Sequence, residues 1–145
     1  DGGSALWMED TINSLSFDCN IHTFDINQER VNIPQNSKIK FHKLNNHNID
    51  RFVDENKTLF ENLERPILMI EDSHENVNGL IRALNPFLKS GDYLIIEDTL
   101  DQRKYNETIL SENGIRNMNY EVDTFYCDFW GVNNSWNINS IFKKL

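Results

Sequence analysis

The sequence predicts an α/β layered fold with a mostly parallel sheet and helices on both faces. Two continuous apolar runs of four residues, 67–70 and 93–96, are typical of strands that are buried on both sides. Between them, residues 77–88 carry apolar side chains at helical spacing. Because strands that alternate with helices pair in parallel through right-handed crossovers, such helices are expected to cover the sheet.

The other elements are predicted from the same patterns and from residues that begin or stop a helix. Ser4 can cap a helix at its amino end, and Pro66 ends the helix that precedes the strand at 67–70. The predicted elements are a helix over 5–15, strands over 21–25 and 38–44, a helix over 49–63, a helix over 104–113 and a strand over 138–144.

Polar and acidic residues follow the predicted strands. They are Asp25, Asn45, Asn46, Glu71, Asp72, Glu97 and Asp98. In α/β sheets, ligands bind outside the carboxyl ends of the strands. These residues therefore gather where a ligand site is expected.

Asp72, Glu97 and Asp98 form the sharpest of these sets, because they follow two buried strands that are joined by one helix. Their strand ends should be neighbours on one edge of the sheet. Three carboxylates in one place repel one another unless protons or a cation neutralise them, and Mg²⁺ prefers oxygen ligands. The set therefore indicates a divalent metal site, with loop acids that point apart into water as the alternative.

A nucleoside-binding unit is indicated earlier in the chain. Gly2 and Gly3 open a helix and would let a ligand approach the backbone, with Ser4 beside them. Asp25 lies 22 residues after Gly3 (25 − 3 = 22) and ends a strand, where a carboxylate can accept hydrogen bonds from ribose hydroxyls. The alternative is an ordinary turn followed by a solvated acid.

Composition limits the function classes. The chain has 145 residues, of which 39% are hydrophobic, so it can form one domain with a core. Its 14 basic and 23 acidic residues give a net charge of −9, which argues against nucleic acid or an anionic membrane as the main partner. Two cysteines are too few for a disulfide scaffold, and a reduced, cytoplasmic protein is expected.

Several segments, in matching order, resemble the cephalosporin hydroxylase family of class I S-adenosylmethionine-dependent methyltransferases. The segments are GGSAL at 2–6, TFDI at 23–26, IEDSH at 70–74, GDYLIIEDT at 91–99, YEVD at 120–123 and NINSIFKK at 137–144. The resemblance implies a Rossmann-like class I methyltransferase sheet over residues 1–145. It also implies a metal-dependent O-methyltransferase that acts on hydroxyls of sugars or other small molecules.

The resemblance implies roles for individual residues as well. The residues matched to S-adenosylmethionine are Gly2, Gly3 and Ser4 at the methionine end, Asp25 at the ribose and Asn45 near the adenine. The residues matched to the Mg²⁺ ligands are Asp72, Glu97 and Asp98. The family usually has a histidine base at the position of Glu75, and His74 lies one residue earlier, so both are candidates for the catalytic base.

In that family, a further strand precedes the glycine turn and lies between the strands that end here at Asp25 and Asp72. The chain is therefore expected to be an N-terminally truncated piece of a longer protein, without the first strand. Homo-oligomerisation is left open, as are two other functions: an inactive nucleotide-binding or assembly subunit with the same fold, and a methyltransferase that needs no metal. The expected acceptor is a small molecule or sugar, with no nucleic acid or membrane as partner.

Overall fold

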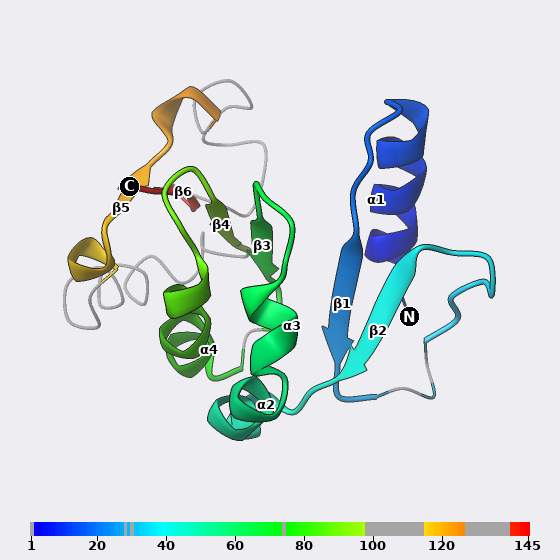
Figure 1. Cartoon of the computed structure of the whole chain (residues 1–145), viewed down its shortest axis with the longest axis horizontal. Coiled ribbons are helices and arrows are strands. Elements are labelled where there is room, and N and C mark those ends of the chain that lie inside the picture. The colour runs from blue at the N-terminus through cyan, green and yellow to red at the C-terminus, as the bar shows by residue number, and fades with distance from the viewer. Residues whose placement is uncertain (1, 28, 30, 74, 98–114, 127–139) are drawn as a thin grey trace. The chain divides into compact units, whose positions relative to one another are not determined.

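The computed structural model describes residues 2–27, 29, 31–73, 75–97, 115–126 and 140–145 (Figure 1). The chain divides into two compact units, Asp1–Ile49 and Asp50–Leu145. The helix predicted near 104–113 lies outside the described residues. No helix in the described ranges is long and apolar enough to cross a bilayer.

The first unit is a helix packed on two parallel strands. Its elements are α1 (Gly3–Ser14), β1 (Ile21–Asp25), β2 (Ile39–Lys43) and the short 3₁₀ helix η2 (Asn46–Asn48). Helix α1 contacts both strands, and the register pairs Ile21 with Ile39. The Glu9 carboxylate on α1 accepts hydrogen bonds from the Ser37 hydroxyl (2.9 Å) and the Lys38 amide (2.5 Å). This side chain therefore fastens the helix to the amino end of β2.

Helix α1 begins two residues earlier than predicted. Gly2 is its N-cap, with φ 78° and ψ 4°, a left-handed conformation that glycine adopts without strain. The Gly2 carbonyl accepts the Leu6 N–H at 3.0 Å, which closes the first helical turn. The prediction that Ser4 caps the helix is therefore wrong, because Ser4 already lies inside that turn.

The second unit is built on a four-stranded sheet in the order β3-β4-β6-β5. Strands β3 and β4 are parallel, as predicted, while β6 pairs antiparallel with both β4 and β5. The antiparallel half of this sheet was not predicted. The elements, with α2 beginning at the boundary between the units, are α2 (Ile49–Glu55), α3 (Lys57–Glu61), β3 (Leu68–Glu71), α4 (Val77–Leu84), η3 (Asn85–Phe87), β4 (Tyr93–Ile96), η4 (Arg116–Met118), β5 (Tyr120–Val122) and β6 (Ile141–Lys144).

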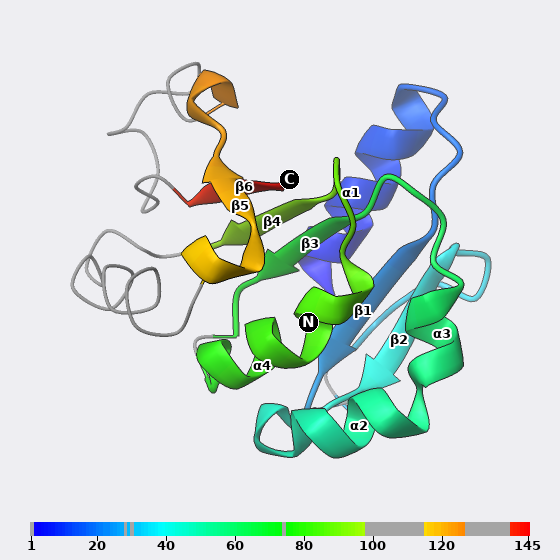
Figure 2. The ribbon, with the colours of Figure 1, turned by 60° about the vertical axis from the view of Figure 1, so that its left-hand side comes forward.

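The core of the second unit lies between α4 and the sheet (Figure 2). Val77 and Ile81 form the buried face of α4, as the apolar spacing predicted. They pack in one cluster with Leu94 on β4 and Phe142 on β6, and each of these four side chains is almost fully buried. This cluster holds the helix that connects β3 to β4, and so sets the two strand ends beside each other.

Two predicted elements differ in detail. The single helix expected over 49–63 is two short helices separated at Asn56, whose φ of −114° and ψ of 20° interrupt the helical conformation. Strand β3 is not buried on both sides, because it lies at the edge of the four-stranded sheet and its Leu68 is 58% exposed. Strand β4 lies inside that sheet, and each of its residues is buried or half-buried.

A buried carboxylate ties together the amino ends of β3 and β4. Asp92 is 1% exposed and immediately precedes β4. Its two oxygens accept the backbone N–H groups of Ile67 (2.8 Å) and Lys89 (2.7 Å), and it forms an ion pair with Arg65. The Arg65 guanidinium also donates to the Phe87 carbonyl (2.6 Å). These contacts fix the end of the parallel pair that lies opposite the predicted ligand site.

Candidate functional site

The carboxyl ends of β3 and β4 bring Asp72 and Glu97 to neighbouring positions. The register pairs Glu71 with Ile96, the last residues of the two strands, and the predicted ligands are the next residues along each chain segment. The Glu97 N–H donates to the Glu71 carbonyl at 2.9 Å, which extends the ladder one residue beyond β4. Asp72 is exposed and Glu97 is half-buried. Both can therefore offer oxygens at this edge of the sheet.

The turn after β3 is ordered by its own side chains. Oε1 of the buried Glu71 accepts hydrogen bonds from the Ser73 amide (2.9 Å) and the Ser73 hydroxyl (2.5 Å). The Ser73 hydroxyl oxygen also lies 3.5 Å from the amide nitrogen of Glu75. Glu75, one of the two candidate bases, is exposed, and the other candidate, His74, lies outside the described residues.

The third predicted metal ligand, Asp98, also lies outside the described residues. Within the part of the chain that the structure describes, no three His, Cys, Asp or Glu side chains gather closely enough to hold a metal ion. Asp72 and Glu97 supply carboxylate oxygens, the ligands that Mg²⁺ prefers, from adjacent strand ends. The donor set fits Mg²⁺, and the convergence of all three acids on one ion stays a prediction.

The amino end of α1 points the same way as the carboxyl ends of β1 and β2, because the helix runs opposite to both strands (Figure 1). The N–H groups of a first helical turn have no carbonyl one turn earlier to bond. Outside its chain neighbours and the backbone of its own helix, a Cβ atom at Gly3 would meet no atom within 4 Å, and Ser4 is exposed. Open space beside these donors fits the approach of a ligand to the backbone, as predicted for the methionine end of the cofactor.

Asp25 and Asn45 lie at the same edge of the first unit. Strands β1 and β2 end in register, with Asp25 opposite Lys43. Asp25 is exposed, and its Oδ1 accepts the Asn27 N–H at 2.8 Å. Asn45 is half-buried, and its Oδ1 accepts the His47 N–H at 3.0 Å and so caps η2. These side chains therefore order the loops that follow the two strands, next to the predicted ribose and adenine positions.

Two histidines that were not predicted from the sequence form a pair on these strands. Nδ1 of His22 lies 3.0 Å from Nε2 of His42, and the Phe24 ring stacks on His42 with 4.9 Å between ring centres. Each histidine lies three residues before a predicted cofactor residue, His22 before Asp25 and His42 before Asn45. The register pairs Phe24 with His42, and His22 lies two residues before Phe24, on the same side of β1, because alternate residues of a strand face the same side. The pair could have been found from the sequence only if this register had been known.

The histidine pair makes stability depend on pH. Burial is the largest cause that lowers the pKa of both His22 and His42, and the charge of Lys40 lowers the pKa of each further. Protonation is therefore less favourable in the folded chain, so the unfolded chain binds more protons and stability rises with pH. The contribution is complete above the ordinary histidine value of about 6.5 and is lost as the pH falls below it.

We expect the melting temperature to fall between about pH 7.5 and about pH 5.5, the range in which an ordinary histidine takes up its proton. In the double variant His22→Gln/His42→Gln this fall should be smaller. His47→Gln is the matched control, because the His47 side chain is exposed, and it should keep the wild-type pH dependence. Thermal unfolding followed by circular dichroism measures all three. Equal pH dependence in the double variant and the wild type would contradict the assignment.

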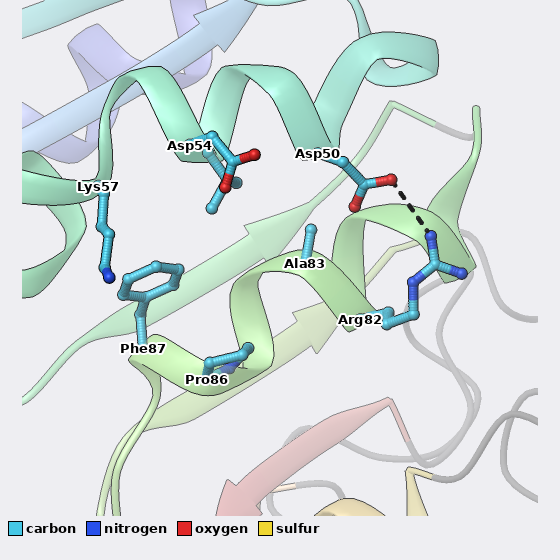
Figure 3. A pocket seen from close by; sticks show the side chains of 8 residues that line it. Asp50, Asp54, Lys57, Arg82, Ala83, Pro86 and Phe87 are labelled. Atoms are coloured by element: carbon cyan, nitrogen blue, oxygen red, sulfur yellow. Dashed lines mark ion pairs between the residues drawn. The ribbon is translucent and has the colours of Figure 1, made fainter.

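A groove of about 300 Å³ lies elsewhere in the second unit, lined by residues of α2, α3, α4 and η3 (Figure 3). Asp50 and Arg82 form an exposed ion pair in it, with 3.5 Å between the charged atoms. The lining residues are Asp50, Val53, Asp54, Lys57, Arg82, Ala83, Pro86 and Phe87. No predicted cofactor, metal or base residue lines this groove, so the strand ends remain the candidate site.

The chain has an α/β fold with polar residues at the carboxyl ends of its parallel strands, and the family that it matches is one of O-methyltransferases. A family model described as "Rhamnosyl O-methyltransferase/CmcI" matches residues 1–118 of the chain. The chain belongs to this family, and the resemblance to the cephalosporin hydroxylase family is confirmed.

One solved structure, "CmcI-N160 apo-structure", is similar to the whole chain, with a TM-score of 0.79 and 21% sequence identity over 100% of the chain. At this identity the similarity concerns the fold, and it confirms the predicted fold class. The chain spans 60% of the length of that protein. Comparison with curated proteins finds no significant match.

Proposed function

We propose that this chain carries the S-adenosylmethionine-binding and Mg²⁺-binding part of an O-methyltransferase that acts on a hydroxyl of a small molecule or sugar. Membership of the rhamnosyl O-methyltransferase/CmcI family supports the reaction class. The observation that carries the proposal is the parallel register of β3 and β4, which sets Asp72 beside Glu97. The net charge of −9 supports a partner other than nucleic acid or an anionic membrane, and the two cysteines support a cytoplasmic location.

The first unit would hold the cofactor. Gly2, Gly3 and Ser4 would receive the methionine end, where first-turn N–H groups can donate to its carboxylate. The open space beside Gly3 supports this role, because a side chain there would fill it. Asp25 would accept hydrogen bonds from the ribose hydroxyls, and Asn45 would lie near the adenine.

The second unit would hold the metal ion through carboxylate oxygens of Asp72, Glu97 and Asp98. When bound, Mg²⁺ supplies a positive charge that orients a ligated hydroxyl and lowers its pKa. The protein itself would contribute to catalysis by positioning the acceptor, because the acceptor oxygen must approach the methyl group in line with the bond that breaks. Such positioning is worth up to about 7–11 kcal/mol in favourable cases. The β3–β4 ladder supports this role, because it fixes the register of the two strand ends that Asp72 and Glu97 follow.

A base must take the proton that leaves the acceptor hydroxyl. We propose His74, because an imidazole that titrates near about pH 6.5 is a better base at neutral pH than an ordinary carboxylate. Glu75 is the alternative, since it occupies the position at which the family usually has its histidine. Glu75 is exposed in the turn before α4, where its carboxylate can reach solvent or a ligand.

Calorimetry with S-adenosylmethionine tests the cofactor site. Asp25→Ala removes a charged hydrogen-bond acceptor from the ribose and should weaken binding by about 1.5–3 kcal/mol, which is roughly 10- to 150-fold in the dissociation constant. Asp18→Ala is the control, because Asp18 is an exposed acid that precedes β1 at its opposite end. Binding that is equally tight in wild type, Asp25→Ala and Asp18→Ala would leave Asp25 as a loop acid.

A further inference from the structure

Glu71 is a buried carboxylate that the proposed chemistry does not use. It is the last residue of β3 and is only 3% exposed. Its backbone carbonyl accepts a hydrogen bond from the Glu97 N–H at 2.9 Å. In the sequence, Glu71 immediately precedes Asp72. Its backbone is therefore linked to both predicted metal ligands of the described residues, covalently to Asp72 and by a hydrogen bond to Glu97.

The side chain of Glu71 bonds within the turn that follows it. Oε1 accepts both the amide and the hydroxyl of Ser73, at 2.9 and 2.5 Å. Holding the Ser73 amide fixes the plane of the peptide between Asp72 and Ser73, and with it the direction in which the Asp72 side chain leaves the backbone. The Ser73 hydroxyl oxygen also lies 3.5 Å from the amide nitrogen of Glu75, one of the two candidate bases.

The hydrogen-bond partners of Glu71 differ in kind from those of Asp92, the buried carboxylate at the other end of the same two strands. The Asp92 carboxylate joins separate segments, because its partners are Arg65, Ile67 and Lys89. The Glu71 carboxylate instead contacts Ser73, only two residues away in the sequence. Its hydrogen bonds therefore shape a single turn, whereas those of Asp92 join separate segments. Burying a polar group is costly unless it is hydrogen-bonded, and these hydrogen bonds offset that cost for both carboxylates.

We infer that Glu71 is a positioning residue: through Ser73 it holds the turn at Asp72 in the geometry that binds the metal ion. This inference rests on the proposed function, since it concerns the same metal site. Hydrogen-bond partners that orient metal ligands commonly contribute about 10- to 100-fold to metal affinity.

Titration of the full-length gene product with MgCl₂, followed by calorimetry, tests the inference on binding alone. Glu71→Gln and Ser73→Ala should each weaken Mg²⁺ binding by about 10-fold. Glu71→Gln replaces a charged acceptor by a neutral, weaker one, and Ser73→Ala removes the hydroxyl donor, so both changes weaken the same contact and the double variant should bind little more weakly than the more affected single variant. Matched controls are Glu121→Gln on β5 and Ser90→Ala in the turn before β4, two exposed residues that should keep wild-type affinity.

The outcomes separate the inference from the proposed function. If Asp72→Asn loses Mg²⁺ binding while Glu71→Gln and Ser73→Ala keep it, the positioning role is overturned and the metal site stands. If Glu71→Gln abolishes binding and Ser73→Ala leaves it intact, Glu71 is itself a ligand and the positioning role is again wrong. If the wild type binds no Mg²⁺, the metal site fails and the role of Glu71 fails with it. If Glu71→Gln does not fold, the Mg²⁺ affinity of Ser73→Ala alone tests the inference, because Ser73 is exposed.

Discussion

Asp72→Asn and Glu97→Gln should each lower the rate of methyl transfer by about 100- to 1,000-fold, because metal assistance at the reacting oxygen is worth several kcal/mol. Each change replaces one carboxylate oxygen of the predicted Mg²⁺ site by an amide nitrogen, which is not a ligand for a hard cation. The affinity for S-adenosylmethionine should change little, since the predicted cofactor residues lie in the first unit, Asp1–Ile49.

The measurement for this prediction is the rate of S-adenosylhomocysteine formation at saturating cofactor, with the MgCl₂ concentration varied. Asp54→Asn is the matched control: it removes an exposed carboxylate on α2, in the groove that contains no predicted site residue. It should keep the wild-type rate. A rate that falls equally in Asp54→Asn and Asp72→Asn, or in neither, would contradict the assignment of Asp72 and Glu97.

Asp92→Ala should lower the free energy of unfolding by about 2–4 kcal/mol, because a buried carboxylate that accepts two backbone N–H groups and pairs with a partly exposed arginine is lost. The change leaves the Arg65 guanidinium without its carboxylate and the N–H groups of Ile67 and Lys89 without their acceptor. Asp92→Asn keeps one acceptor oxygen and should lose less. Urea denaturation of the three proteins measures the differences.

Asp50→Asn is the control for this second prediction. Asp50 pairs with Arg82 at 3.5 Å, but both side chains are well exposed, and such surface pairs contribute about 0–1 kcal/mol. A loss below about 1 kcal/mol in Asp92→Ala, similar to that in Asp50→Asn, would show that the contacts at the amino ends of β3 and β4 do not hold the sheet.

The parts of the fold that were predicted are those with a strong local signal. Strands β3 and β4 are short apolar runs, and the acids at their ends follow from the sequence alone. The pairing of β6 with β4 and β5 is a long-range choice that no local pattern specifies. The break at Asn56 was missed because the apolar spacing continues through it, while the backbone there leaves the helical conformation.

The candidate site was predicted to a similar extent. Glu71 and Asp72 were both recognised as strand-end acids, but the structure buries Glu71 and exposes Asp72. Neighbouring residues of a strand point to opposite sides, so the outcome depends on which side faces the core. The His22–His42 pair likewise depends on the register of β1 and β2, which places residues 20 positions apart within hydrogen-bond distance.

The most direct test of the proposed function is the formation of S-adenosylhomocysteine by the full-length gene product with a panel of hydroxylated sugars and small molecules, in MgCl₂ and in a metal chelator. The proposal predicts cofactor turnover with at least one hydroxyl acceptor, its loss in the chelator and its recovery when MgCl₂ is restored. Turnover that is unchanged in the chelator would contradict the metal role of Asp72, Glu97 and Asp98. A protein that neither binds S-adenosylmethionine nor converts it with any acceptor would contradict the methyltransferase itself.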